Sequence, residues 1–131
     1  MDKFYLHHIA YICINIEKSI ASFEKLGYKL YKEKCFDKIQ NNWVCFLSND
    51  ESYLIELIQP ANEKSTIKNF NSGIHHLCYD VSNFNGNFKE YFKKLKIGKI
   101  FTNEIIAPAI DMRSVVFSQL YDGSYIEFIL N

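Results

Sequence analysis

The sequence lacks an excess of charge of either sign. Fifteen Lys and Arg residues balance fifteen Asp and Glu residues, which gives a formal net charge of zero. This balance removes the positive field that nucleic-acid-binding and polybasic membrane-surface proteins present. We therefore expect a small-molecule substrate that is recognised locally, and neither a nucleic acid nor a membrane as partner.

Long apolar runs and paired cysteines are missing as well. No run approaches the roughly 20 residues of a membrane span, and the first residues do not lead into a signal-peptide core, which predicts a cytoplasmic protein. The cysteines form no C-x-x-C pair, so we expect reduced core residues rather than disulfides or zinc ligands. They are Cys13, Cys35, Cys45 and Cys78.

Apolar and aromatic residues are abundant. They make up 48% and 16% of a chain of 131 residues. Such a composition supplies a packed interior, and the length suits one domain. The sequence therefore predicts a single globular domain spanning residues 1–131.

The chain repeats itself. Nearly the same five-residue sequence occurs twice at an offset of 68 residues, in His7–Tyr11 and His75–Tyr79. A later offset of 71 relates two further pairs of segments. Constant offsets over separated segments indicate two copies of one supersecondary unit. We place the copies at about 5–60 and 73–130, joined by a polar linker over 61–72. The later pairs are Trp43–Phe46 with Ser114–Phe117, and Ile55–Ile58 with Ile126–Ile129.

Each copy is predicted to run strand, helix and then three strands, which makes the fold class α+β. In the first copy a strand over Leu6–Ile14 precedes a helix that Asn15 caps and Gly27 ends. In the second copy Asn83 and Gly98 hold the corresponding places. The later strands are expected at Tyr28–Phe36, Trp43–Leu47, Tyr53–Gln59, Lys99–Glu104, Ser114–Leu120 and Ser124–Leu130, with a short helical turn in the linker at Ser65–Phe70.

Four titratable residues lie inside apolar strand segments, and the repeat maps them onto one another in two pairs: His8 with His76, and Glu56 with Glu127. A buried carboxylate without a partner costs several kcal/mol, and the one arginine, Arg113, cannot neutralise both. Taken singly, each histidine could be a hydrogen-bonded core residue and each glutamate an edge residue. One divalent cation would satisfy all four together.

Two further histidines, His7 and His75, precede the candidate ligands. Successive side chains of a strand point to opposite faces. We therefore expect both residues to face away from the metal site and to be structural.

The chain resembles the vicinal oxygen chelate superfamily, which includes glyoxalase I, methylmalonyl-CoA epimerase, extradiol dioxygenases and the fosfomycin- and bleomycin-resistance proteins. The stretch Ser65–Tyr79, STIKNFNSGIHHLCY, looks most like the epimerase branch, whereas the His–Glu–His–Glu set looks like bacterial glyoxalase I. The stretch Ile105–Asp111 departs from the epimerases. The resemblance implies two βαβββ modules in a curved eight-stranded mixed sheet, with His8, Glu56, His76 and Glu127 as metal ligands.

The function that this resemblance implies is that of a divalent-metal-dependent lyase or isomerase, with Ni, Co, Zn, Mn or Fe as the ion. Such a site stabilises an enolate or enediolate, and Glu127, or Glu56 by pseudo-symmetry, would move the proton. Return of the proton to the neighbouring carbon gives the isomerisation of lactoylglutathione lyase, and return to the other face gives methylmalonyl-CoA epimerisation. We expect a homodimer.

Two alternatives belong to other classes. Extradiol-type dioxygenases bind iron with two histidines and one carboxylate, so the second glutamate would occupy a position that oxygen needs. Metal-free drug-binding resistance proteins generally lack the ligand residues, and all four are present here.

Arg113 is the candidate anchor for an anionic part of the substrate, because a guanidinium can bind a carboxylate or phosphate through two parallel hydrogen bonds. The alternative is a surface ion pair with Asp111 or Asp122, which would contribute little.

Overall fold

The computed structural model of the protein describes residues 4–131. Its first half follows the predicted order of strand, helix and three strands. The second half repeats that order with one strand interrupted. The first half contains β1 (Tyr5–Ile12), α1 (Ile16–Lys25), β2 (Lys29–Asp37), β3 (Asn42–Ser48) and β4 (Leu54–Pro60); the second contains β5 (Gly73–Asp80), α2 (Phe88–Leu95), β6 (Gly98–Ile100), β7 (Ile105–Ala107), a 3-10 turn (Pro108–Ile110), β8 (Arg113–Leu120) and β9 (Tyr125–Ile129).

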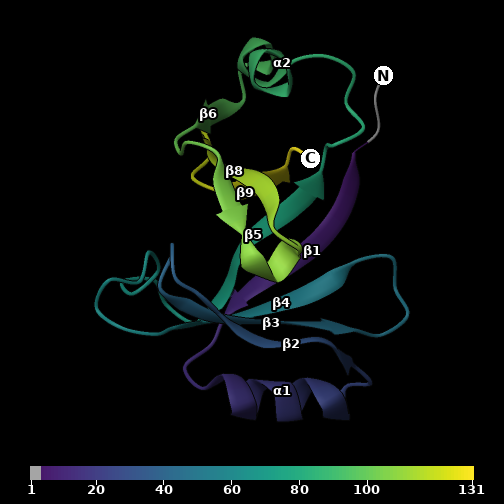
Figure 1. Cartoon of the computed structure of the whole chain (residues 1–131), viewed down its shortest axis with the longest axis vertical. Helices are drawn as coiled ribbons and strands as arrows, with labels where there is room; N and C mark the ends of the chain where they lie inside the picture. The colour runs from purple at the N-terminus through teal and green to yellow at the C-terminus, as the bar shows by residue number, and fades with distance from the viewer. Residues whose placement is uncertain (1–3) are drawn as a thin grey trace.

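The strands form one mixed sheet in the order β2-β3-β4-β1-β5-β9-β8-β6, with the short β7 also paired to β8. The antiparallel pair of β1 and β5 joins the two halves at the centre, while β1–β4 and β5–β9 are parallel. The helices α1 and α2 lie at opposite ends of the molecule (Figure 1). The predicted fold class, two βαβββ modules in a curved eight-stranded mixed sheet, is confirmed.

The strand register repeats at the predicted offsets. Ala10 pairs with Glu56 across β1 and β4, and Cys78 pairs with Glu127 across β5 and β9. Phe46 faces Glu56 on the other side. Its counterpart in the second half, Phe117, faces Glu127. Each glutamate therefore pairs with residues at equivalent positions of the repeat.

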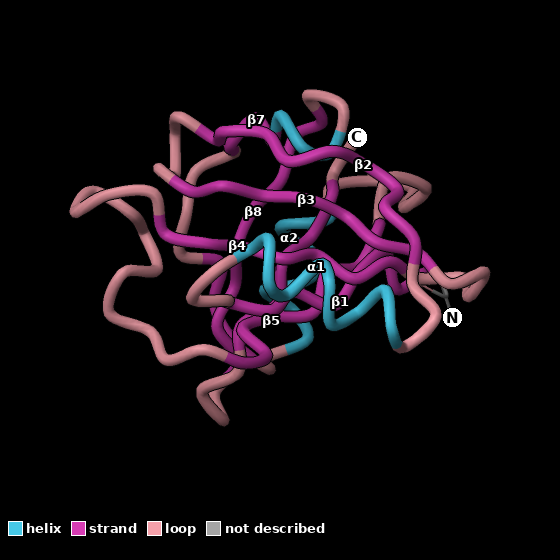
Figure 2. Tube along the Cα trace, turned by 90° about the horizontal axis from the view of Figure 1, so that it is seen from below, coloured by secondary structure: helices cyan, strands magenta, loops and turns pink. Residues whose placement is uncertain are grey.

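Each helix covers the outer face of its own half. The side chain of Ile16 on α1 packs with Ile55 and Leu57 of β4, and Figure 2 shows α1 in front of the strands of the first half. Phe88 and Phe92 of α2 pack in the same way with Phe128 of β9. The inner, concave face is thereby left to the remaining strand residues. Neither helix of the described chain is long and apolar enough to cross a bilayer.

Both ends of α1 agree with the sequence prediction. Asn15 caps its start by accepting a hydrogen bond from the Lys18 amide at 3.0 Å. Gly27 follows its end with φ +97°, a conformation that glycine adopts without strain. The amides of Gly27 and Tyr28 then bond to the carbonyls of Glu24 and Phe23, which is the paired pattern of a glycine-terminated helix.

Both predicted boundaries of the second helix are wrong. Gly86 has φ +117° and interrupts the backbone after Asn83, so the helix starts four residues later, and Asn87 is the cap that accepts from Glu90 at 3.1 Å. The left-handed residue at its other end is Lys96, with φ +55°. Gly98 instead begins β6, where a Cβ atom would overlap the backbone of Gln119 and Leu120.

The strand predicted at Lys99–Glu104 is also wrong, because β6 ends at Ile100 and the next strand, β7, begins only at Ile105. Backbone pairing with β8 extends as far as Ile100 opposite Ser118. The Thr102 hydroxyl oxygen then accepts a hydrogen bond from the Phe117 amide at 3.0 Å, where a regular strand would offer a backbone carbonyl. Pairing resumes only at Ile105 opposite Val115.

The close approach of the backbone to Gly98 predicts that adding one methyl group there will destabilise the protein. Gly98→Ala should lower the free energy of unfolding by about 1–3 kcal/mol, because the new methyl group meets backbone that cannot rotate away. Urea denaturation measures this difference. Lys99→Ala, at the exposed neighbouring position, is the control and should change stability by less than about 0.5 kcal/mol. Equal stabilities for the two variants would contradict the packing described here.

Candidate metal centre

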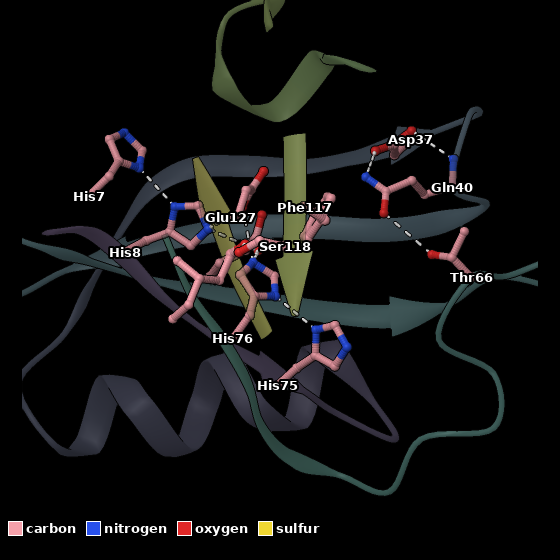
Figure 3. A network of polar contacts seen from close by, with 12 residues as sticks. His7, His8, Asp37, Gln40, Thr66, His75, His76, Phe117, Ser118 and Glu127 are labelled. Atoms are coloured by element: carbon pink, nitrogen blue, oxygen red, sulfur yellow. Dashed lines mark hydrogen bonds and ion pairs between the residues drawn. The ribbon is translucent and has the colours of Figure 1, made fainter. Parts of the chain in front are cut away.

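Four buried side chains meet at the centre of the concave face. They come from the four central strands, β4, β1, β5 and β9, and each is at most 6% exposed. One ligand atom from each lies within 4.8 Å of the others. The cluster is built within one chain (Figure 3). Its members are His8, Glu56, His76 and Glu127, the four residues that the sequence singled out.

Strand alternation explains why these polar side chains point inward. On β4, Ile55 and Leu57 pack beneath α1, so Glu56 between them must face the concave side together with Ile58. On β9 the neighbours of Glu127, which are Ile126 and Phe128, pack beneath α2 in the same way. The helices thus fix the direction of both carboxylates.

The spacing of the four groups suits a shared cation. The Nε2 atoms of His8 and His76 lie 3.0–3.6 Å from the Oε1 atoms of Glu56 and Glu127. Metal–ligand bonds of about 2.0–2.1 Å place tetrahedral ligands about 3.3 Å apart. The observed separations bracket that value, so an ion at the centre would touch all four groups.

One nitrogen in the cluster has no hydrogen-bond partner. His8 Nε2 is fully buried and lies 3.1 Å from Glu127 Oε1, but without the direction that a hydrogen bond needs. Within residues 4–131, no Lys or Arg pairs with either glutamate. A buried imidazole nitrogen without a hydrogen-bond partner, beside two carboxylates that no Lys or Arg neutralises, is the donor set of a divalent-cation site.

The electrostatics of the metal-free cluster follow from this burial. Burial by itself would lower the pKa of His8, but the charge of Glu56, and to a smaller extent the contacts with Cys78 and Glu127, raise that pKa well above 6.5. Burial likewise opposes ionisation of Glu127, yet contacts with His76 and His8 hold its pKa below the usual range. A proton on His8 therefore takes part of the role that a cation would have.

A cavity opens from the cluster and carries polar groups that the sequence analysis missed. With its open mouth it encloses about 450 Å³, and Asp37, Gln40 and Asn42 line it beside the two glutamates. Asp37 Oδ1 accepts from the amides of Ile39 and Gln40, and its Oδ2 accepts from the Gln40 side chain at 3.3 Å. At the offset of 71 residues Asp37 falls on Pro108, so the repeat could not reveal this carboxylate; its place at the end of a strand was the available signal.

The linker forms one wall of this cavity. Ser65 donates to Asn42 Oδ1 at 2.5 Å, and Ile67, two residues further along the chain, lines the cavity. The predicted turn at Ser65–Phe70 is present, with the Phe70 amide bonded to the Ile67 carbonyl at 3.0 Å. The segment that joins the two halves thus also shapes the site.

A second, apolar cavity adjoins the first. Together with the open space at its mouth it spans about 740 Å³, and it shares Gln40, Ile67, His75 and Phe117 with the cavity above the cluster. Among the described residues, neither cavity is lined by Lys or Arg. The remaining walls are mostly apolar and include Phe70, Phe101, Ile105 and Tyr125.

The expected orientation of His7 is wrong, because β1 contains a bulge. Leu6 pairs with Tyr79 and His8 with Cys78, which leaves His7 as an extra residue opposite β5. A bulge changes the direction of a side chain. The imidazole of His7 consequently lies beside that of His8, with their Nδ1 atoms 2.8 Å apart.

The same correction applies to His75. Ala10 pairs with His76 and Tyr11 with Ile74, so His75 is the extra residue on β5. Its Nδ1 lies 2.8 Å from Nδ1 of His76. Burial, and to a smaller extent the neighbouring His76, lowers the pKa of His75 to about 4. Both bulged histidines are thus in contact with the cluster rather than turned away from it.

Arg113 is not among the residues that line either cavity. Its Nη1 pairs with Asp80 at 3.0 Å, and its Nε donates to the Asn131 carbonyl at 2.8 Å. The ion-pair partner is thus neither Asp111 nor Asp122. The suggested role of Arg113 as a substrate anchor stays a prediction.

The paired βαβββ halves and the buried His–Glu–His–Glu cluster define a class of protein that comparison with known families identifies. Residues 7–117 match the family described as "Glyoxalase/Bleomycin resistance protein/Dioxygenase superfamily". The chain belongs to this superfamily.

Individual relatives extend the comparison. An uncharacterised protein of Bacillus subtilis, YwkD, is 31% identical over 91 residues, which cover 68% of this chain and 70% of that protein. The crystal structure of the hypothetical protein BH1468 from Bacillus halodurans has a TM-score of 0.79 at 20% identity, covering 98% of this chain and 94% of that one. Methylmalonyl-CoA epimerase from Mycobacterium tuberculosis has the same TM-score at 18% identity, with 95% and 85% covered.

The cluster predicts that the folded protein is stabilised by a divalent ion. Zinc at about 100 times its dissociation constant should raise the free energy of unfolding by about 2.7 kcal/mol. His76→Ala should abolish this gain by removing one nitrogen ligand. Ser118→Ala is the matched control, since it removes a buried hydrogen bond to the Ile126 carbonyl without touching the cluster, and should keep the gain. A thermal melt with zinc that leaves the wild type unchanged would contradict the assignment.

The raised pKa of His8 predicts that metal binding strengthens as pH rises. A proton on His8 stabilises the metal-free protein fully below pH 6.5, and this stabilisation is lost as pH rises through the higher folded pKa. A metal ion requires the neutral ring, so each unit of acidification below that pKa should weaken binding about tenfold. Zinc titrations at pH 6 and pH 8 measure the difference, and equal affinities would contradict the role of His8.

Proposed function

We propose that the protein is a divalent-metal-dependent lyase or isomerase that removes a proton next to the carbonyl or thioester group of a small substrate. The observation that carries the proposal is the buried cluster of two histidines and two glutamates, which opens into a cavity and which no Lys or Arg of the described chain neutralises. The ligands would be His8, Glu56, His76 and Glu127.

The chemistry divides between the ion and the side chains. When bound, a divalent ion acts as a Lewis acid that stabilises the negative charge of the enolate or enediolate. Glu127 and Glu56 lie on opposite halves of the pseudo-symmetric centre, and a carboxylate there can take the proton and return it to the same carbon or to its neighbour. Burial keeps bulk water away from the proton while it is held.

Asp37 is a third carboxylate in the same cavity. Its Oδ1 already accepts two amide hydrogens, whereas Oδ2 accepts only from the Gln40 side chain at 3.3 Å. Oδ2 is thus a second candidate for the base, and it differs from the glutamates in not belonging to the ligand cluster. If it is the base, Asp37→Asn will bind metal normally and lose activity. Glu127→Gln will weaken metal binding in either case.

Two reactions fit the proposal. Several solved structures with the same fold are methylmalonyl-CoA epimerases, and one of them, from Streptomyces coelicolor, holds 2-nitronate-propionyl-CoA. This likeness, with the Gly-x-His-His sequence of β5, supports the epimerase reaction. The second glutamate in the cluster supports the glyoxalase I reaction. The second cavity has mostly apolar walls and no Lys or Arg among the described residues, so we expect the part of the substrate enclosed there to be apolar.

The proposal predicts metal-dependent exchange of a carbon-bound proton. Protein loaded with Ni, Co, Zn, Mn or Fe is incubated in deuterium oxide with 2-methylmalonyl-CoA, or with the hemithioacetal of methylglyoxal and glutathione. Mass spectrometry should find deuterium at the carbon next to the carbonyl group of one substrate. His76→Ala, treated identically, is the control and should give only background exchange. An absence of exchange with both substrates and all five ions would contradict the proposed reaction.

A further inference from the structure

Each bulge in the central strand pair brings one imidazole against another. Nδ1 of His7 lies 2.8 Å from Nδ1 of His8, and the same distance separates His75 from His76 (Figure 3). Two ring nitrogens at this distance share one proton, so one ring donates and the other accepts. The two contacts are related by the pseudo-symmetry of the chain.

The direction of each hydrogen bond follows from the opposite edge of the ligand ring. In both His8 and His76 it is Nε2 that faces the carboxylates at the centre. An imidazole that gives its Nε2 lone pair to a metal ion keeps its proton on Nδ1. The ligand rings must then donate, and His7 and His75 must accept as neutral rings with their own proton on Nε2.

We propose that His7 and His75 are positioning residues that hold His8 and His76 in the Nδ1–H tautomer and in the ring orientation that binds a divalent metal. The inference rests on the proposed metal centre. Metal-bound histidines usually donate to a carboxylate, a backbone carbonyl or water. Here two carboxylates already balance a divalent ion, so a neutral imidazole serves as acceptor without adding excess negative charge.

Neighbouring aromatic rings hold the acceptors in place. The ring of His75 stacks on Tyr125, with centroids 5.3 Å apart and an angle of 16° between the planes. Phe70 packs against it in a T-shaped arrangement, with ring centroids 4.8 Å apart. His7 packs against Phe46 at 6.1 Å. Each acceptor therefore has its orientation set by packing as well as by the bulge.

The two halves differ in one side chain beside these histidine contacts, and this difference supplies a control. Cys78 Sγ lies within 4.8 Å of nitrogen atoms of both His7 and His8. The offset of 68 residues places Ala10 at the equivalent position in the other half. If the Cys78 thiol rather than His7 accepted the proton of His8, His76 would have no equivalent partner, because Ala10 stands at that position. The histidine contact, in contrast, is present in both halves.

Zinc affinity and the positions of the ring protons test the inference without any enzyme assay. His7→Leu removes the acceptor and should weaken zinc binding about 10–100-fold, as loss of an outer partner of a metal ligand does. In His7→Asn the side-chain oxygen can stand where Nδ1 stood and accept the same hydrogen bond. That variant should bind zinc within about threefold of the wild type. Competition with a chromophoric chelator gives the affinities.

Nitrogen-15 NMR of the zinc-loaded wild type needs no substitution, so it decides the question even if a variant fails to fold. It should find a proton on Nδ1 of His8 and none on Nδ1 of His7. Cys78→Ala is the matched control and should leave zinc affinity unchanged. Unaltered affinity in His7→Leu, or a proton on His7 Nδ1, would overturn the inference. Wild-type protein that binds no zinc would instead overturn the metal centre itself.

Discussion

The burial of two carboxylates at the junction of the two halves is the constraint on which the rest of the structure depends. Glu56 and Glu127 are inward-facing because the apolar residues on either side of them are needed beneath the helices. Once inside, their charges require compensation, since isolated buried carboxylates are costly. The two histidines, the bulges behind them and the cavity in front are arranged around that requirement.

Much of the fold could be predicted because the repeat carries information that single elements do not. Glu56 and Glu127 are related by the same sequence offset as Phe46 and Phe117, and in the sheet Glu56 pairs with Phe46 just as Glu127 pairs with Phe117. Where the halves diverge, prediction from the repeat failed. Gly98 matches Gly27 in sequence but meets the backbone of a neighbouring strand instead of ending a helix, and no local pattern specifies such a tertiary contact.

The candidate site could be predicted in its centre and not in its surroundings. Strand periodicity and the repeat brought the four cluster residues together, whereas alternation gave the wrong direction for His7 and His75. A bulge is set by the register between two strands that are far apart in the chain. Asp37 and the linker wall depend on how loops fold over the cavity, which periodicity does not encode.

The antiparallel pairing of β1 with β5 has a consequence for how such a protein can be assembled. His8 lies opposite Cys78 and Ala10 lies opposite His76, so exchanging the two strands reproduces the same pairing. Each half contributes one imidazole and one carboxylate, and neither half alone contains a complete set. Two identical half-length chains related by a twofold axis would recreate all four groups at their interface. The present arrangement is therefore equivalent to a symmetric dimer of half-length chains whose two subunits are covalently fused, which has left each half free to acquire differences such as Cys78 without losing the shared centre.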